Sequence, residues 1–209
     1  MSSNKNEVHL AKSDPILRAL MKRVKLQPLK LRKNYFEALI RAVANQQLSG
    51  KAAQTILNRV VALFKSNKFP TPQEYLKMSD MKLRSAGFSN SKVAYTKNVA
   101  RFFMEREKEI KRVHKLTDEE VIKLLTEIKG IGIWSVEMFM IFSLGREDVF
   151  SYGDLGLRNG VKKVYSFKKE PTIKQVQKIV ETWRPYRTHG ARYMWASLSL
   201  TDKENKNKK

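Results

Sequence analysis

The sequence contains no cysteine among its 209 residues. The chain therefore cannot form a disulfide, hold an iron–sulfur cluster through thiolates or build a zinc site with cysteine ligands. It also lacks an apolar run long enough to cross a bilayer, and its first ten residues, MSSNKNEVHL, contain no apolar signal core. These absences predict an intracellular protein without a membrane partner.

Acidic residues are scarce relative to basic ones. The chain has 42 Lys and Arg against 20 Asp and Glu, a formal net charge of +22. Such an excess favours a polyanionic partner, most often nucleic acid. The alternative is a set of solvated basic helices. An anionic membrane surface fits less well, because no helix concentrates basic residues beside a broad aromatic face. Charge alone does not separate DNA from RNA, or an enzyme from a binding protein.

Runs of alternating apolar and polar residues, typical of strands, are missing, and the pattern is helical nearly throughout. Helical periodicity covers residues 13–24, 34–47, 49–65, 79–87, 89–110, 117–130, about 133–144, 153–165, 172–183 and 187–200. Four prolines between these segments read as breaks: Pro70, Pro72, Pro171 and Pro185. The fold class is therefore all-α, with about ten helices and short connections. The polar end, residues 201–209, is predicted to be a disordered basic tail.

Helix boundaries can be assigned at three places. Ser13 and Asn34 are expected to cap the helices that follow them, and Thr117 with Glu120 forms a capping-box pattern. The segment from about 133 to 144 is apolar on all sides, which predicts a helix buried on all sides.

The stretch EIKGIGIWSVEMFMIFSLG, residues 127–145, places two glycines between an amphipathic helix and this apolar one. Gly130 and Gly132 allow a positive φ and a close approach of the backbone. The unpaired amides at the start of the second helix would then point out of the turn, where an anion can bind. An ordinary αα-corner fits the local sequence equally well.

Asp154 stands at the expected start of a helix, where an aspartate commonly serves as N-cap. A capping carboxylate can also be catalytic, because the helix amides favour its ionised form. Glu137, Glu147 and Asp148 are rival acids, and Glu137 lies inside the apolar helix.

The hairpin IKGIGIW, followed by Asp154 twenty positions after Trp134, resembles the helix–hairpin–helix DNA glycosylase superfamily. Three further stretches resemble its 3-methyladenine DNA glycosylase II family in a compact form without the N-terminal β domain: NQQLSGKAA (45–53), AGFSNSKVAYTKNVA (86–100) and WRPYRTHGARYMW (183–195). The resemblance covers most of residues 34–198. It implies a two-lobed helical bundle with the hairpin, about 117–145, at the interlobe cleft. One lobe would be 34–145, and 1–33 with 146–209 would form the lobe that carries Asp154.

The resemblance also implies an activity, the hydrolysis of the bond between an alkylated purine such as 3-methyladenine or 7-methylguanine and its deoxyribose. The base leaves the stack, and Asp154 stabilises the oxocarbenium-like sugar. Gly153 replaces an acid that many relatives have there, so the local loop differs. Bifunctional relatives have a lysine where this chain has Trp134, and an indole cannot form a Schiff base, which predicts no lyase step. The lesion range stays open to ethenoadenine, hypoxanthine and uracil. The alternatives are a glycosylase of the same fold for deaminated or oxidised bases, and a non-catalytic damage- or junction-binding module.

The remaining site residues are carried over from the same resemblance. The base pocket would contain Trp134, Trp195, Met138 and Tyr152. Gln47 would fill the gap that the flipped base leaves in the stack, with Gln46 as the second candidate. The residues that bind phosphate would be Gly130, Gly132, Ile133 and Lys129, and Ser89 and Lys92 would make phosphate or structural contacts. No cofactor is expected for catalysis, although the hairpin would hold a structural Na+ or K+ at the backbone carbonyls of Thr126, Ile128 and Ile131. The expected partner is double-stranded DNA with damaged bases, bound by a monomer in the nucleoid or nucleus.

Overall fold

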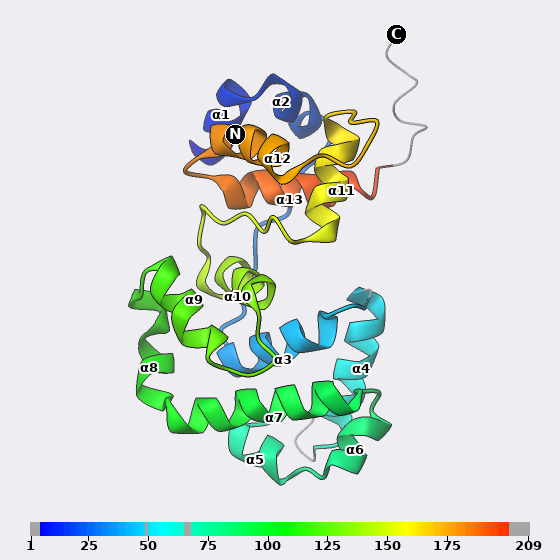
Figure 1. Ribbon diagram of the computed structural model, residues 1–209, viewed down its shortest axis with the longest axis vertical. Helices are drawn as coiled ribbons and strands as arrows, with labels where there is room; N and C mark the ends of the chain where they lie inside the picture. Colours follow the sequence, from blue (N-terminus) through cyan, green and yellow to red (C-terminus); the bar gives the residue numbers. More distant parts are fainter. Residues whose placement is uncertain (1–4, 49, 65–67, 201–209) are drawn as a thin grey trace. The chain divides into compact units, whose positions relative to one another are not determined.

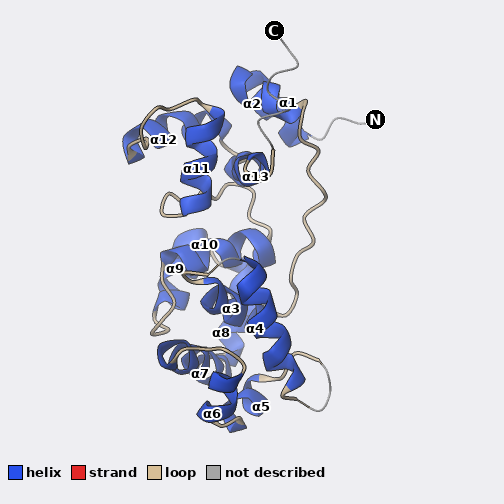
Figure 2. Cartoon of the chain, turned by 90° about the vertical axis from the view of Figure 1, so that its right-hand side faces the viewer, coloured by secondary structure: helices blue, strands red, loops and turns tan. Residues whose placement is uncertain are grey.

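The structure is a computed structural model that describes residues 5–48, 50–64 and 68–200 (Figure 1). Within these ranges the chain is helical and contains no strand, which confirms the all-α prediction (Figure 2). The predicted disordered tail, residues 201–209, lies outside the described residues. None of the described helices is long and apolar enough to cross a membrane.

The chain divides into two compact units, Leu31–Leu144 and a second made of Met1–Lys30 with Gly145–Lys209. The first unit contains α3 (Tyr35–Asn45), α4 (Gly50–Ala62), α5 (Pro72–Lys77), α6 (Asp80–Ser85), α7 (Asn90–Glu105), α8 (Glu107–Arg112), a 3₁₀ turn (Val113–Lys115), α9 (Asp118–Thr126), α10 (Ile133–Phe139) and a π-helix (Met140–Leu144). The second contains α1 (Lys5–Ser13), α2 (Pro15–Met21), α11 (Leu155–Val164), α12 (Ile173–Val180), a 3₁₀ turn (Glu181–Trp183) and α13 (Arg187–Ser197).

The core of the unit Leu31–Leu144 is aromatic at one end. The buried ring of Phe36 on α3 meets Tyr75 at 5.6 Å and Phe103 at 5.5 Å between ring centroids. Helix α7 packs against both α3 and α5 and lies between them in Figure 1. Aromatic pairs in such tilted arrangements add about 0.5–1.5 kcal/mol each beyond the area they bury.

The second unit is built around Trp183, whose side chain is fully buried together with Leu10 and Leu17. Its indole N–H donates to Asp14 Oδ2 at 2.9 Å, and the Tyr165 hydroxyl donates to the same oxygen. The other carboxylate oxygen, Oδ1, accepts from Leu17 N at 2.9 Å and so caps α2. One buried aspartate thereby joins the start of α2 to Trp183 and to the end of α11.

Two of the predicted caps are correct and one is wrong. Asn34 Oδ1 accepts from Glu37 N at 3.1 Å, and Thr117 with Glu120 forms the expected capping box. Ser13 does not cap α2, because Ser13 is the last residue of α1 and Asp14 is the cap. Proline at the first position of α2 makes the preceding residue the cap.

Four other points of the helix prediction are corrected. Residues 5–13 form α1, where no helix was expected, and Pro72 begins α5 behind a Thr71 capping box, where a break was expected. The predicted helix 89–110 divides at Arg106 into α7 and α8. The apolar segment 133–144 is helical, but it is not buried on all sides, since Ile133 is 58% exposed.

Candidate nucleic-acid-binding and catalytic site

The two glycines of the hairpin, residues 117–145, have different structural roles. Gly130 has φ +104°, and a Cβ placed there would lie 2.1 Å from Cγ of Tyr95. Gly132 has φ −103° and caps α10 without a side-chain hydrogen bond, and a Cβ there would meet no atom within 4 Å. Gly130 is thus required by the fold of the turn. Gly132 leaves open space in front of the first amides of α10, where a ligand backbone can approach.

The inner carbonyls of the turn are held by side chains from other helices. Gln46 Nε2 donates to Gly130 O at 3.0 Å and lies 3.2 Å from Ser135 Oγ. Asn98 Nδ2 on α7 donates to Lys129 O at 3.0 Å. The side chains of Lys129 and Ile133 are exposed. These contacts fix two carbonyls of the turn and leave the side chains of Lys129 and Ile133 accessible.

The predicted alkali-ion ligands lie on this turn. Ile128 O accepts from Ile131 N at 2.9 Å, and a carbonyl oxygen has a second lone pair for another partner. Carbonyl oxygens of Thr126, Ile128 and Ile131 are the ligand type that hard cations prefer, so the residues fit such an ion. Among the described residues, no three or more His, Asp or Glu side chains gather into a metal site of another type.

The wedge turn, residues 45–48, follows the end of α3. Gln47 is exposed and has φ +57°, a backbone conformation uncommon for any residue other than glycine. Gln46 is half-buried, and its amide is bound to the hairpin as described above. Gln47 is therefore better placed than Gln46 to enter a DNA stack.

Lys92 on α7 holds this wedge turn in place. Its Nζ donates to Ala44 O at 2.9 Å and to Gln46 O at 2.8 Å, and burial lowers the pKa of its amine. Ser89 is exposed and caps α7, with Oγ accepting from Lys92 N at 3.3 Å. Of the two roles considered for these residues, the geometry favours the structural one.

Replacing Lys92 with methionine is expected to weaken DNA binding without changing its salt dependence. Two carbonyls would lose their donor, at a cost of about 1–3 kcal/mol each if they stay buried, and the wedge turn would loosen. The ammonium does not neutralise a phosphate in this arrangement, so the slope of log K against log salt stays at its wild-type value.

Lys129→Met is the matched control, since that exposed lysine lies on the outer side of the hairpin. Loss of one phosphate contact there makes the negative slope of log K against log salt less steep by about 0.9. Fluorescence anisotropy titrations at several salt concentrations measure both slopes. A lowered slope in Lys92→Met would mean that Lys92 contacts phosphate after all.

A cavity of about 330 Å³ opens within the unit Leu31–Leu144 between α3, α4 and the helix that follows the hairpin. It brings Trp134 and Met138 together, both half-buried, against the apolar side chains of Leu57 and Phe139. The cavity is one place where this helix is not covered by protein, since Trp134 and Met138 line it, while Ile133 is exposed outside it. Tyr152 and Trp195, the other two predicted pocket residues, belong to the second unit.

The polar wall of this cavity comes from α3 and α4. Arg41 Nε donates to Glu37 Oε1 at 2.8 Å, and Arg41 NH1 donates to Gln54 Oε1 at 2.8 Å. Arg41, Gln54 and Asn45 line the cavity together with Trp134. An aromatic side chain with a few hydrogen-bonding groups in one cavity is the kind of lining that holds a planar heterocycle.

Asp154 is the N-cap of α11, as its sequence position indicated. Its Oδ1 accepts from Leu157 N at 2.7 Å and from Trp195 Nε1 at 2.9 Å. Gly156 makes room for this pair, because a Cβ there would lie 3.0 Å from Asp154 Oδ1 and 3.1 Å from Trp195 Cδ1. Gly153 is exposed and contacts nothing that a side chain would disturb. The carboxylate is thus held in one orientation by a backbone amide and an indole.

The bond from Trp195 to Asp154 was not foreseen, because it joins residues 41 positions apart with no local signal. Trp195 is half-buried against the core of its unit. Tyr152, in the loop before Asp154, packs against Phe150 at 5.0 Å between ring centroids. Burial raises the pKa of the Tyr152 hydroxyl, and Arg187 beside it acts in the opposite direction.

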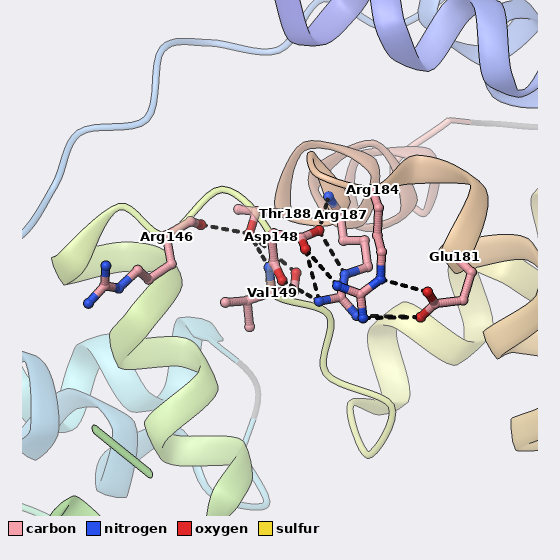
Figure 3. A network of polar contacts seen from close by, with 7 residues as sticks. All are labelled: Arg146, Asp148, Val149, Glu181, Arg184, Arg187 and Thr188. Atoms are coloured by element: carbon pink, nitrogen blue, oxygen red, sulfur yellow. Dashed lines mark hydrogen bonds and ion pairs between the residues drawn. The ribbon is translucent and has the colours of Figure 1, made fainter. Parts of the chain in front are cut away.

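The three rival acids have other surroundings. Asp148 accepts hydrogen bonds from Arg184 and Arg187, which commits its carboxylate to an ion-pair network (Figure 3). The Glu147 side chain is 61% exposed and lies 3.6 Å from His189. Glu137 is half-buried on α10. Of these four acids, Asp154 is the one whose side chain caps α11, by accepting from Leu157 N in the first turn.

Comparison with known proteins places this arrangement in a family. The Schizosaccharomyces pombe DNA-3-methyladenine glycosylase 1 is 40% identical over 205 residues, 96% of this chain and 90% of that protein. The structure of S. pombe Mag1 in complex with abasic DNA superposes with a TM-score of 0.85 at 39% identity, covering 95% of this chain and 98% of that one. A Bacillus halodurans DNA-3-methyladenine glycosidase gives 0.81 at 33% identity, over 97% and 93% of the two chains. The HhH-GPD family model matches residues 40–185, and the chain belongs to this superfamily of base excision DNA repair proteins.

Proposed function

We propose that this protein is a monofunctional DNA glycosylase that hydrolyses the N-glycosidic bond of alkylated purines of the 3-methyladenine and 7-methylguanine type. The observation that carries the proposal is the Asp154 carboxylate, fixed by Leu157 N and Trp195 Nε1 at the start of α11 in a chain of the HhH-GPD superfamily. The relatives whose names specify 3-methyladenine support this lesion class.

Asp154 acts on the sugar that is left when the base departs. The N-glycosidic bond breaks toward an oxocarbenium-like sugar, and a carboxylate held close to C1′ stabilises that positive charge. The same carboxylate orients the water that completes hydrolysis. Because both donors bind Oδ1, the orientation of the carboxylate is set before substrate binds. N-alkylation makes the purine cationic and therefore a good leaving group, so the site does not require a strong general acid.

Three elements hold the DNA during this reaction. The amides at Gly132 and Ile133, with Lys129, bind backbone phosphate, and an alkali ion on the hairpin carbonyls would strengthen this contact. Gln47 fills the gap that the flipped nucleotide leaves in the stack. The net charge of +22 attracts double-stranded DNA in a sequence-independent manner.

The flipped base is recognised by its aromatic surroundings. In the cavity of the unit Leu31–Leu144, Trp134 supplies an aromatic face for a planar base, and Met138 adds apolar surface beside it. A cationic alkylated purine gains a cation–π attraction on such faces, which an undamaged base does not. The protein acts on this substrate as a monomer, inside the cell with its DNA.

The test of this function is release of free bases from methylated DNA without cleavage of the strand. Incubation should release 3-methyladenine or 7-methylguanine, detected by chromatography, and leave abasic sites that break only after alkali. Trp134 has no amine, so borohydride should trap no protein–DNA adduct. A panel of duplexes with single ethenoadenine, hypoxanthine, uracil or oxidised lesions defines the range. Strand breaks without alkali would contradict the monofunctional assignment, and binding with no base release on any lesion would favour a non-catalytic module.

A further inference from the structure

The loop that leads to Asp154, residues 145–153, is bound through hydrogen bonds and an ion pair by the first turn of α13 (Figure 3). Arg187 Nε donates to Asp148 Oδ1 at 2.8 Å, and Arg187 NH2 donates to Oδ2 at 3.1 Å and to the Asp148 carbonyl at 2.7 Å. The Arg187 side chain is only 15% exposed. A paired guanidinium and carboxylate of this geometry fix direction as well as distance.

Thr188, the next residue of α13, binds the same loop from within the core. Its side chain is buried, and Oγ1 donates to Arg146 O at 2.7 Å while accepting from Val149 N at 3.0 Å. Its own backbone amide donates to Glu147 O at 2.9 Å. Together with Arg187, this residue determines the path of residues 146–149.

Two helical turns later, α13 also carries Trp195, whose indole binds Asp154. Helix α13 therefore holds the loop at both ends. The eight residues from Arg187 to Trp195 advance about 12 Å along a rigid helix. The six residues from Asp148 to Asp154 can extend to about 20 Å, which is longer than that stretch of helix. A loop longer than the distance between its attachment points can take several paths, so contacts at both ends are needed to restrict it.

We propose that Arg187 is a positioning residue for the reaction, because its pair with Asp148 sets the path of the loop that presents Asp154. This proposal rests on the proposed catalytic role of Asp154. Without the Arg187 side chain, Asp148 loses the three guanidinium hydrogen bonds and keeps only those from Arg184 NH1 and the Arg187 amide on its carboxylate. Thr188 still holds residues 146–149, but Asp148 itself is less constrained, and the part of the loop between Asp148 and Asp154 gains freedom to move. Asp154 remains the cap of α11, so the fold persists while the carboxylate shifts relative to the sugar. A misplacement of about 1 Å can lower the rate of such a step by about a hundredfold.

The experiment measures the single-turnover rate of 7-methylguanine release by Arg187→Ala, beside the Kd for a duplex with an abasic-site analogue and the melting temperature. We expect release to slow by about tenfold to a hundredfold, with Kd within about threefold of wild type and a folded protein at the assay temperature. Asp148→Asn should give a slower rate of the same kind. The double variant should be no slower than the slower single variant, because both changes break one pair.

Arg158→Ala is the matched control. Arg158 lies on α11, one turn after Asp154, and its Nε and NH2 donate to Glu170 Oε1 at 2.9 and 2.7 Å. This variant also loses an arginine and an ion pair, but the hydrogen bonds that it removes go to Glu170 and not to residues 146–149. Its release rate should stay within about twofold of wild type, the small effect typical of surface ion pairs.

Three results would overturn the proposal: a wild-type release rate in Arg187→Ala, an equal loss in Arg158→Ala, or a loss of rate fully explained by weaker DNA binding. If Arg187→Ala is unfolded, Asp148→Asn decides by the same criteria, since it keeps the shape of the side chain. Failure here is separable from failure of the proposed function. An active Asp154→Asn variant would contradict the function itself, whereas an inactive one beside a normal Arg187→Ala would contradict only the positioning role.

Discussion

Asp154→Asn is expected to lower the single-turnover rate of base release by at least about a hundredfold, in the range that loss of one preorganised charge or base contributes to enzymes. The amide cannot balance the positive charge that develops on the sugar. It can still accept from Leu157 N and Trp195 Nε1, and asparagine is as good an N-cap as aspartate. The melting temperature and the affinity for abasic-site DNA should therefore stay close to wild type. Base release from methylated DNA, thermal melting and anisotropy measure the three quantities.

Glu147→Gln and Glu137→Gln are the controls for this experiment. Each removes one negative charge from a rival acid, and neither side chain caps a helix. Both variants should release base at close to the wild-type rate. If Asp154→Asn remains active while either control is inactive, the catalytic carboxylate is on another residue and the mechanism must be rebuilt around it.

Features that depend on neighbours in sequence were predictable. The all-α class, the capping box at Thr117 and the helix that Asp154 caps are each encoded within about four residues, the range over which caps and helical periodicity act. The family motifs then indicated which turn is the hairpin and which acid is the candidate catalytic residue. Local patterns therefore located the hairpin and the carboxylate.

Features that depend on distant contacts were not predictable. Gln46 reaches Gly130 across 84 positions, Lys92 reaches Ala44 across 48, and Arg187 reaches Asp148 across 39. A side chain that binds a remote carbonyl has no periodic signature, so the sequence left Gln46 as the second candidate for filling the DNA stack and left Lys92 between a phosphate and a structural contact. The cap at Asp14 had a local signal in the proline that follows it, but the hydrogen bonds from Trp183 and Tyr165 to its carboxylate join distant parts of the chain and had none.

The helix after the hairpin shows how a correct pattern can lead to a wrong inference. Its residues are apolar on every side, yet Trp134 and Met138 line a cavity and Ile133 is exposed. In a globular core an all-apolar helix is surrounded by protein. Under the proposed function, the part of that apolar surface at Trp134 and Met138 would contact a flipped base instead of protein. Hydrophobicity alone does not distinguish these two uses.

Gly130→Ala is expected to have the largest effect on the DNA-binding element. Alanine at φ +104° is strained, and its Cβ would overlap the ring of Tyr95, with Cγ at 2.1 Å. Backbone strain and overpacking each cost about 1–3 kcal/mol, so we expect a loss of roughly 2–5 kcal/mol in the free energy of unfolding. Denaturant unfolding measures that loss, and anisotropy measures the accompanying fall in DNA affinity.

Gly132→Ala provides the contrast, because its φ is ordinary and its Cβ meets nothing within 4 Å. Its free energy of unfolding should fall by only about 0.5–1 kcal/mol, the difference between glycine and alanine at an N-cap. Any loss of DNA affinity in this variant then comes from the methyl group standing between the α10 amides and a phosphate. A simple corner between two helices predicts the opposite for binding, with Gly132→Ala leaving affinity unchanged. The two variants thus separate the requirement of the fold from the requirement of the ligand, since the fold needs Gly130 for its positive φ and its contact with Tyr95, whereas a large loss of DNA affinity in Gly132→Ala would come from the ligand.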